Sequence, residues 1–373
     1  MAHLRVLIAG GGTGGHIIPA LAVARELVAR HAAEVLFIGT ARGMESRLVP
    51  EAGFRLRLVD VGQLKNVSLL TRLRTLFALP RAIFACKRLI REFNPGVVFG
   101  VGGYAAGPAM ASALLLGIPS MAFEPNAVPG LANRLVGKRV QAAAVNFQSA
   151  ARWFRSAEVT GIPVRPEFFA LAAPPASAAP HLLVFGGSQG ARIFNSVLPK
   201  IIPGLLDAIP GLAVLHQSGA RHFEQTMAAY AASGADPDRW EVRPFLDDMP
   251  ARFAQANLVM ARSGASTVAE LAAAGKPALL VPFAAAADDH QRRNAEEMER
   301  AGAAVLLDES ELDERDLDAP GKLPTALASL LQSPERRAVM SAAARTQAHP
   351  DAAERIANRI AALADPGAFS QVV

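Results

Sequence analysis

His16 is the first group in this chain that could do chemistry, because it closes a run of glycines. The run Gly10-Gly11-Gly12-Thr13-Gly14-Gly15 follows an apolar segment, and a helical pattern of apolar residues continues to residue 30. We therefore predict a strand, a loop and a helix in that order. Glycines let a ligand approach the main chain, and a helix N-terminus favours anions. The loop is predicted to hold a phosphate-bearing ligand with His16 as a general base at its edge; a histidine that only caps the turn is the alternative.

A second glycine loop, Gly186-Gly187-Ser188-Gln189-Gly190, follows the apolar residues 182–185. It matches the nucleophile elbow of α/β-hydrolases, and Asp247 or Asp288 followed by His290 would complete the chain order of such a site. The other interpretation makes Ser188 a hydroxyl donor to phosphate. We prefer it because it gives both glycine loops the same role. A plain helix N-cap is the third interpretation.

The first loop also has the G-x-G-x-x-G spacing of dinucleotide-binding proteins, which requires an acidic residue at the end of the second strand. That strand is predicted to end in Gly39-Thr40. Glu34 precedes it and Glu45 lies well beyond it. We therefore expect no nicotinamide cofactor. No glycine loop is followed by Gly-Lys-Ser/Thr, which argues against a Walker-type NTPase.

Three further clusters carry polar side chains at the ends of predicted strands. Glu124 and Asn126 could hydrogen-bond a sugar, although a solvated loop is the alternative. Glu270 lies one helical turn after the loop 262–267, where a carboxylate can accept two ribose hydroxyls; a solvated glutamate is its alternative. The run Asp288-Asp289-His290-Gln291 has metal-ligand types, but no second histidine lies four residues on, so we predict no metal.

Composition and charge indicate a globular protein of two domains. The chain has 373 residues, and its single cysteine, Cys86, excludes a disulfide framework and a cysteine metal cluster and fits a reducing compartment. Residues 1–164 carry 19 Lys/Arg and 8 Asp/Glu, a net charge of +11, whereas residues 165–373 carry a net charge of −6. The basic half favours an anionic partner, either nucleic acid or a membrane surface, unless the asymmetry is incidental.

Residues 65–91 alternate basic and apolar side chains at helical spacing, with Pro80 expected to divide them into two helices. This pattern suits an anionic bilayer surface, and an ordinary core-packed helix with a solvated face explains it equally well. Residues 93–123 carry no charge, but prolines and glycines interrupt them too often for a membrane span. The first strand starts at Leu4, and we expect no signal peptide before it.

Apolar runs alternate with helical patterns along the whole chain, which predicts an α/β fold with parallel sheets. Strands are expected near 4–9, 34–39, 56–61, 96–101, 119–123, 140–145, 182–185, 212–216, 240–243, 257–261, 277–281 and 303–307. An alanine- and proline-rich stretch, 171–180, has the composition of a linker. The domains are predicted as 1–164 and 165–350, with a last helix in 351–373 packing back on the first.

Together these motifs resemble the MurG family, whose members are membrane-associated glycosyltransferases. The family passes N-acetylglucosamine (GlcNAc) from UDP-GlcNAc to lipid I, making lipid II for peptidoglycan. The resemblance covers nearly the whole chain. It rests on Gly11-Gly12-Thr13-Gly14-Gly15-His16 with Pro19, Gly102-Gly103-Tyr104 with Gly107-Pro108, Glu124 with Asn126, Gly186-Gly187-Ser188-Gln189-Gly190-Ala191-Arg192, Phe245-Leu246-Asp247-Asp248-Met249, Arg262-Ser263-Gly264-Ala265, and Asp288-Asp289-His290-Gln291 with Asn294-Ala295.

The resemblance implies the GT-B fold, two Rossmann-like domains whose parallel sheets face a central cleft. For an inverting transfer of this kind we predict His16 as the catalytic base, with Glu124 as the alternative. The donor would contact Arg165, Ser188, Gln189, Gly190, Phe245, Leu246, Glu270, His290 and Gln291. The acceptor would contact Thr13, Gly14, Gly15, Gly102, Gly103, Tyr104 and Asn126. The membrane contact would include Arg72, Leu73, Leu76, Phe77, Arg81, Phe84 and Arg88.

The same resemblance implies a peripheral enzyme on the cytoplasmic face of the bacterial plasma membrane. Its partners would be UDP-GlcNAc as co-substrate, lipid I, anionic phospholipid, and other cell-wall synthesis and division proteins, without nucleic acid. No cofactor is required and no metal site is predicted, whereas the sequence does not decide whether a divalent ion assists. The chain departs from the family at Phe123 and Pro125, where the family usually has polar residues, and in the run Pro282-Phe283-Ala284-Ala285-Ala286-Ala287.

Overall fold

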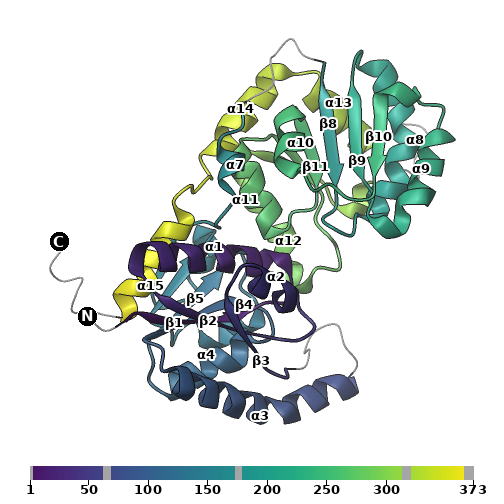
Figure 1. Ribbon diagram of the computed structural model, residues 1–373. Coiled ribbons are helices and arrows are strands. Elements are labelled where there is room, and N and C mark those ends of the chain that lie inside the picture. Colours follow the sequence, from purple (N-terminus) through teal and green to yellow (C-terminus); the bar gives the residue numbers. More distant parts are fainter. Residues whose placement is uncertain (1–2, 62–68, 173–178, 313–320, 365–373) are drawn as a thin grey trace. The chain divides into compact units, whose positions relative to one another are not determined.

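The computed structural model describes residues 3–61, 69–172, 179–312 and 321–364. Within these ranges, only the main chain is described for residues 69–77 and 287. Its contacts divide the chain into two compact units. Unit 1 comprises Met1–Pro163 and Asp351–Val373, and unit 2 comprises Val164–Pro350. Each unit contains a parallel sheet with helices against it (Figure 1). The α/β prediction with parallel sheets is therefore confirmed.

Unit 1 has a seven-stranded sheet in the order β3-β2-β1-β4-β5-β6-β7. Its strands are β1 (Arg5–Gly10), β2 (Glu34–Gly39), β3 (Arg55–Leu58), β4 (Val97–Gly102), β5 (Ser120–Glu124), β6 (Ala142–Val145) and β7 (Ala157–Val159). The strand order reverses between β1 and β4. Loops that leave the carboxyl ends of two such strands diverge, and this point is where α/β sheets bind ligands.

Helices cover the sheet of unit 1, and the last helix of the chain belongs to this unit. They are α1 (Gly14–His31), α2 (Glu45–Glu51), α3 (Leu69–Phe93), α4 (Ala106–Leu115), α5 (Leu131–Val136), α6 (Gln148–Ala151) and α15 (Ala352–Ala364). Helix α15 packs against α1, where Arg30 Nη2 donates to Glu354 Oε2 at 2.8 Å and His31 Nε2 lies 2.9 Å from Asn358 Oδ1. The chain therefore returns to its first unit after completing the second.

Unit 2 repeats the same plan with six strands in the order β10-β9-β8-β11-β12-β13. The strands are β8 (His181–Phe185), β9 (Ala213–Gln217), β10 (Trp240–Arg243), β11 (Leu258–Ala261), β12 (Ala278–Leu280) and β13 (Ala304–Leu306). The helices are α7 (Pro166–Phe169), α8 (Arg192–Ala208), α9 (Phe223–Ala231), α10 (Met249–Gln255), α11 (Ala265–Ala274), α12 (His290–Arg300), α13 (Lys322–Leu331) and α14 (Pro334–Arg345). Here the order reverses between β8 and β11.

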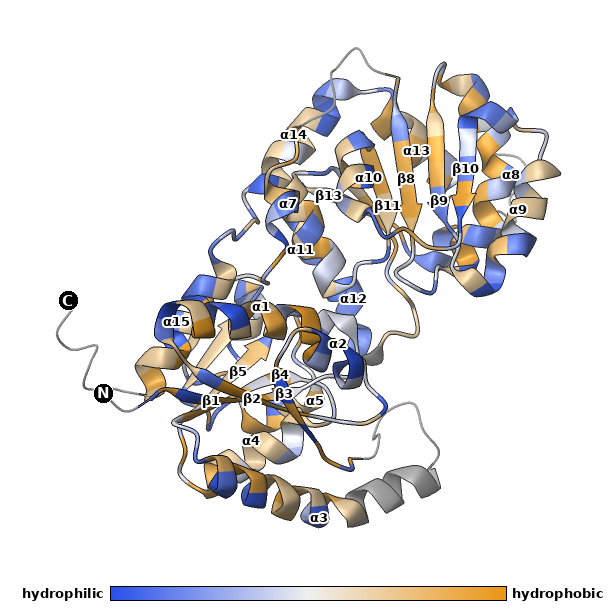
Figure 2. Ribbon diagram, viewed as in Figure 1, coloured by the Kyte–Doolittle hydropathy of each residue, from blue (hydrophilic) through white to orange (hydrophobic). Residues whose placement is uncertain are grey.

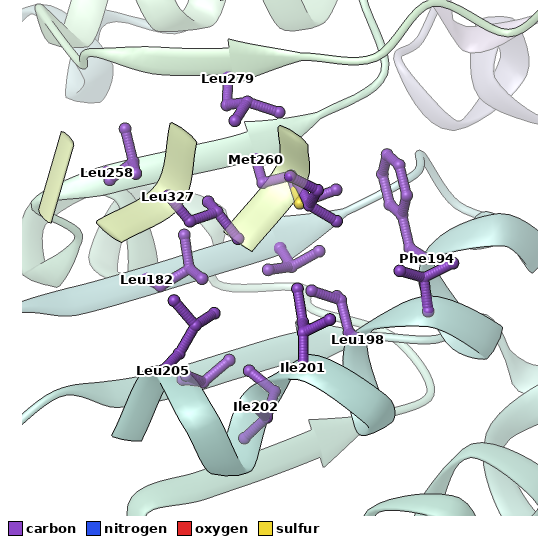
Figure 3. Close-up of a cluster of buried hydrophobic side chains, with 14 of the residues drawn as sticks. Leu182, Phe194, Leu198, Ile201, Ile202, Leu205, Leu258, Met260, Leu279 and Leu327 are labelled. Carbon is purple, nitrogen blue, oxygen red and sulfur yellow. The ribbon is translucent and has the colours of Figure 1, made fainter. Parts of the chain in front are cut away.

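The core of unit 2 lies between its sheet and the helices α8 and α13. Figure 3 shows Leu182, Met260 and Leu279 from three adjacent strands packed with side chains of α8, and all three are almost completely buried. Hydrophobic residues run along most of the central strands in both units (Figure 2). Uninterrupted apolar strands are expected because helices cover both faces of a parallel sheet.

Two expectations about local structure were wrong. Strand β7 was missed, because its central residue is Glu158, whose carboxylate instead pairs with Arg355 of α15 at 2.7 Å. Pro80 does not divide the helix, because α3 continues from Leu69 to Phe93. Its second half buries Ala82, Cys86 and Ile90, and this regular apolar stripe offsets the hydrogen bond that the proline removes.

The alanine- and proline-rich stretch 171–180 lies within unit 2, which the chain enters at Val164. Helix α7 precedes this stretch and anchors the chain there. Phe168 of α7 is fully buried and its ring lies 5.1 Å from that of Phe253 in α10. Residues 173–178 of the stretch lie outside the described part of the chain.

Candidate functional site

The first glycine loop lies at the reversal point of the unit 1 sheet, next to the loop after β4. Gly11 N donates to Gly102 O at 3.2 Å. A Cβ atom on Gly103 would lie only 2.1 Å from Gly11 O, and Gly103 has a φ of +80°. Glycine is therefore required for the two loops to pack. Two loops that the sequence analysis predicted separately form one structure.

His16 stands in the first turn of α1, half-buried beside these loops. Its Nδ1 lies 3.2 Å from Thr13 Oγ1. A Cβ on Gly102 would lie 2.9 Å from His16 Nε2, so the imidazole ring rests against the main chain of Gly102. Tyr104 follows two residues later and is 38% exposed. The structure thus brings Thr13, His16 and Gly102 together.

Glu124 ends β5 and is 2% exposed. Its Oε1 accepts from the main chain and the side chain of Asn126, at 3.0 and 3.2 Å. Its Oε2 accepts from Gly130 N at 3.0 Å and from Asn133 Nδ2 at 2.9 Å. Burial raises the pKa of this carboxyl, and these hydrogen bonds oppose the rise. Glu124 therefore holds the 124–133 segment in place.

Asn133 helps to hold this segment, a contact that the sequence did not indicate. It is 4% exposed and donates both to Glu124 and to Phe123 O, the latter at 2.8 Å. Its position in α5, nine residues after Glu124, gives no local signal. Only the fold of the intervening loop brings the amide and the carboxylate together.

The second glycine loop lies at the reversal point of unit 2, between β8 and α8. Ser188 and Gln189 are exposed at its tip. Gly190 has a φ of +70°, and a Cβ there would lie 1.9 Å from Ser218 O. Gln217 Nε2 also donates to Gly187 O at 2.9 Å. The end of β9 thus holds the loop, which presents its tip at the N-terminus of a 17-residue helix, a suitable place for an anion.

Glu270 lies in α11, which begins at the neighbouring strand end. It is half-buried, and desolvation raises the pKa of its carboxyl to about 7, while the charge of Arg165 lowers it. Arg165 is exposed at the start of α7, and its guanidinium stacks 5.1 Å from the ring of Phe168. A carboxyl group on α11 and a cation at the start of α7 therefore stand close enough to interact.

The remaining predicted donor residues come from two loops of unit 2. Phe245 follows β10 and is 57% exposed, whereas its neighbour Leu246 is 5% exposed. His290 and Gln291 begin α12, after Asp288 and Asp289 in left-handed backbone conformation. Gln291 Oε1 accepts from Phe283 N at 3.0 Å, so this side chain is oriented by the loop that departs from the family pattern.

Arg262 begins the motif Arg262-Ser263-Gly264-Ala265, and its contacts show a role that the sequence did not indicate. It is 8% exposed and donates to Val281 O at 3.1 Å and Pro282 O at 2.9 Å. It also pairs with Glu309. Its guanidinium lies 5.0 and 5.3 Å from the rings of Phe194 and Phe283. One buried cation therefore joins three segments around the predicted donor site.

Comparison with known proteins adds to this geometry. Residues 6–145 match the glycosyltransferase family 28 N-terminal domain, and residues 181–356 match the family's C-terminal domain. A protein of Anaeromyxobacter dehalogenans strain 2CP-C is 45% identical over 360 residues, covering 95% of this chain and 92% of its own length. It is named UDP-N-acetylglucosamine--N-acetylmuramyl-(pentapeptide) pyrophosphoryl-undecaprenol N-acetylglucosamine transferase, as is a Myxococcus xanthus protein that is 41% identical over the same coverage.

The crystal structure of Acinetobacter baumannii MurG superposes with a TM-score of 0.77 at 30% sequence identity, covering 96% of this chain and 99% of that one. This chain belongs to the MurG family of glycosyltransferases. The fold is therefore GT-B, as predicted. Membership in the MurG family also decides between the enzyme classes that the sequence left open, in favour of the transferase and against the serine hydrolase.

The residues predicted as a membrane contact belong to α3. The side chains of Arg72, Leu73, Leu76 and Phe77 fall outside the described part of the chain. Of the others, Arg81 is exposed, Phe84 is 71% exposed, and Arg88 pairs with Glu92 at 3.2 Å. Leu115 at the end of α4 is 66% exposed, and Ser112 of α4 donates to Ile83 O at 3.0 Å. Two exposed apolar side chains thus accompany the basic residues on neighbouring helices.

Metal-binding groups and membrane-spanning helices were sought among the described residues of this MurG family member. These residues contain no group of three or more His, Cys, Asp or Glu side chains arranged to hold a metal ion. None of their helices combines the length and the apolar character that a membrane span requires.

Proposed function

We propose that this protein transfers GlcNAc from UDP-GlcNAc to the muramoyl sugar of lipid I, yielding lipid II for peptidoglycan synthesis. The observation that carries the proposal is the 41–46% identity to relatives named for this transfer, over most of both chains. The two glycine loops support it, since each lies where an α/β sheet binds its ligand. Unit 2 would take the donor and unit 1 the acceptor.

The donor would bind to unit 2 through groups of three kinds. Phe245 offers an exposed ring to the uracil with Leu246 beneath it, and Glu270 accepts hydrogen bonds from the ribose hydroxyls. Ser188, Gln189 and Gly190 meet the diphosphate together with Arg165, and His290 and Gln291 face the sugar. The N-terminus of α8 favours the diphosphate most strongly when UDP leaves, because negative charge then builds up on it.

The acceptor would bind to unit 1 at Thr13, Gly14, Gly15, Gly102, Gly103, Tyr104 and Asn126. The acceptor hydroxyl attacks the anomeric carbon of GlcNAc and forms the new C–O bond. The bond from that carbon to the phosphate oxygen breaks, UDP departs, and the hydroxyl proton passes to His16. This is a single displacement with inversion. Glu124 remains the alternative base, but a carboxylate that already accepts four hydrogen bonds suits it less.

The test of this function is transfer of labelled GlcNAc from UDP-GlcNAc to lipid I by the purified full-length protein. We expect a lipid II product, and thermal unfolding should shift upward with UDP or UDP-GlcNAc but not with NAD. Both results should persist with a chelator present, since no metal is assigned a role. Absence of product with lipid I would contradict the proposal, and a shift with NAD alone would restore the dinucleotide interpretation.

Replacing Glu270 by alanine is expected to raise the donor KM by about 10- to 100-fold with little change in kcat, because charged hydrogen bonds to the ribose are lost. Glu335→Ala, at an exposed position in α14, is the control. Steady-state assays with varied UDP-GlcNAc measure this effect. A change confined to the acceptor KM would place the donor on the other unit.

The pH dependence of donor binding offers a second measurement on Glu270. Its pKa of about 7 means that the carboxyl is largely protonated below that pH, and only the ionised form accepts from both hydroxyls. The donor KM should therefore rise as pH falls below 7, approaching about tenfold per pH unit, and stay level above it. Glu270→Gln should remove this dependence. An unchanged slope in that variant would assign it to another group.

We further propose that α3 and α4 form a peripheral contact with anionic phospholipid on the cytoplasmic face of the membrane. The exposed Phe84 and Leu115 and the net charge of +11 in residues 1–164 support this contact. Reversing Arg72, Arg74, Arg81 and Arg88 to Glu should lower binding to anionic vesicles by more than about 100-fold, because each basic residue contributes about 1 kcal/mol.

Vesicle sedimentation at fixed ionic strength measures this loss. The matched control reverses four exposed arginines of unit 2, Arg293, Arg300, Arg336 and Arg345, which makes the same change in net charge. Equal loss in both variants would mean that net charge alone governs binding. Persistent binding of the α3 variant would show that the contact lies elsewhere.

A further inference from the structure

A buried carboxylate lies beneath the first glycine loop, and the reaction as described above gives it no role. Glu45 is the first residue of α2 and is 1% exposed. It fills a pocket walled by three glycines: a Cβ on Gly11, Gly39 or Gly43 would lie 2.2, 2.4 or 2.0 Å from the nearest atom of its side chain. Any other residue at these positions would displace Glu45, so the loop and this side chain are built to fit each other.

The carboxylate of Glu45 joins two segments that are distant in sequence. Its Oε2 accepts from Gly12 N at 2.6 Å, inside the glycine loop. Its Oε1 accepts from Thr40 N at 2.8 Å and from Thr40 Oγ1 at 2.9 Å, just after β2. Of the protein side chains, only an ionised carboxylate brings two acceptor oxygens and no donor. A glutamine would turn an N–H group toward one of these donors.

The glycine loop is therefore held from two sides. Glu45 holds Gly12, and on the other side Gly11 N donates to Gly102 O at 3.2 Å. Helix α1 starts immediately after the loop, and the N–H groups of His16 and Ile17 both turn back to Thr13 O, each at 3.2 Å. A shift of Gly12 would be passed on to Thr13 and from there to the first turn of the helix, where His16 stands.

We propose that Glu45 is a positioning residue of the transfer reaction, which fixes the glycine loop so that the imidazole of His16 meets the acceptor hydroxyl. The inference rests on the proposed function and deepens it. Because the Gly12 N–H group already donates to Glu45, the phosphates of the acceptor bind at other groups of the loop.

The variant that tests this is Glu45→Gln, which keeps the shape of the side chain and removes one acceptor. The matched control is Glu51→Gln in the same helix, where the carboxylate is 54% exposed and pairs with Arg47 at 3.4 Å. We expect E45Q to lower kcat by about 10-fold or more, as displacement of a reacting group does. The donor KM and the thermal shift with UDP should stay at wild-type values, because the donor binds to unit 2. E51Q should match wild type in every measurement.

If E45Q does not fold, Thr40→Ala is the milder variant to use. It removes the hydrogen bond from Thr40 Oγ1 to the Glu45 carboxylate and leaves the other hydrogen bonds in place. It should lower kcat in the same direction by about two- to fivefold. Wild-type kcat in folded E45Q, or in T40A where E45Q does not fold, would overturn the proposal. So would a rise in donor KM in place of the fall in kcat. Inactive wild-type and E51Q proteins would instead refute the proposed function.

A double-variant cycle tells positioning through His16 from a general structural effect. If Glu45 acts through His16, then E45Q should cause no further loss of kcat in the His16→Ala background, measured by product accumulation over hours. An equal loss in both backgrounds would overturn the proposal. The comparison therefore separates the two roles, because a merely structural role of Glu45 would lower kcat by the same factor with and without His16.

Discussion

His16→Ala is expected to lower kcat by about 10²- to 10⁴-fold, the usual contribution of a positioned general base. The imidazole lies against Gly102 and beside Thr13, among the residues assigned to the acceptor. Removing it takes away the group that is assigned to accept the proton of the acceptor hydroxyl. The donor KM should stay near the wild-type value, since the residues that would bind UDP lie in unit 2.

The pH profile separates this role from simple loss of packing. Protonation of the base should produce a fall in kcat on the acid side of the profile, and that fall should disappear in H16A. His31→Ala is the control, because His31 ends the same helix α1 and contacts Asn358 of α15. Wild-type kcat in H16A would remove His16 as the base and turn attention to Glu124. A raised donor KM would place the imidazole in the donor site.

Much of the fold could be predicted because its signals are local. Apolar runs followed by glycines mark strand ends in a parallel sheet, and the loops after β1 and β8 lie at the reversal points of their sheets. The exceptions had local signals that tertiary contacts overrode. Strand β7 has a polar centre that an ion pair with α15 satisfies, and Pro80 stays within a helix whose later turns are buried.

The residues that the sequence could not assign depend on contacts between distant segments. Glu45 was considered only as a ribose ligand and dismissed for lying beyond the second strand. Its partner Gly12 is 33 residues away, and no spacing rule links them. Asn133 and Arg262 are similar cases, since the carboxylate or rings that define their roles come from other elements. Such residues shape a site without matching a catalytic pattern, and geometry is needed to find them.

Arg262→Met is expected to lower the free energy of unfolding of unit 2 by about 3 kcal/mol, because removing one partner of a buried ion pair leaves the other without compensation. Methionine fills much of the same volume, but it cannot donate to Val281 O and Pro282 O, and it leaves Glu309, whose side chain is 24% exposed, without its cation. The stacking of the guanidinium with Phe194 and Phe283 is also lost.

The two tryptophans of the chain make this prediction measurable for unit 2 alone. Trp153 belongs to unit 1 and Trp240 to unit 2, so a Trp153→Phe background leaves Trp240 as the only tryptophan reporter in urea unfolding. Arg293→Met is the control, because Arg293 is 53% exposed and pairs with Glu296 across one helical turn. It should change stability by less than about 0.5 kcal/mol.

The same variant should also weaken donor binding, because Arg262 ties the start of α8 to the loop that orients Gln291. A smaller thermal shift with UDP-GlcNAc in Arg262→Met, at temperatures where unit 2 stays folded, is the expected result. Arg262→Lys distinguishes the charge from the geometry, since lysine keeps the charge but not the planar fork that reaches two carbonyls and a carboxylate. Full donor affinity in the lysine variant would show that charge alone suffices, and wild-type stability in Arg262→Met would show that the three segments hold together without this residue.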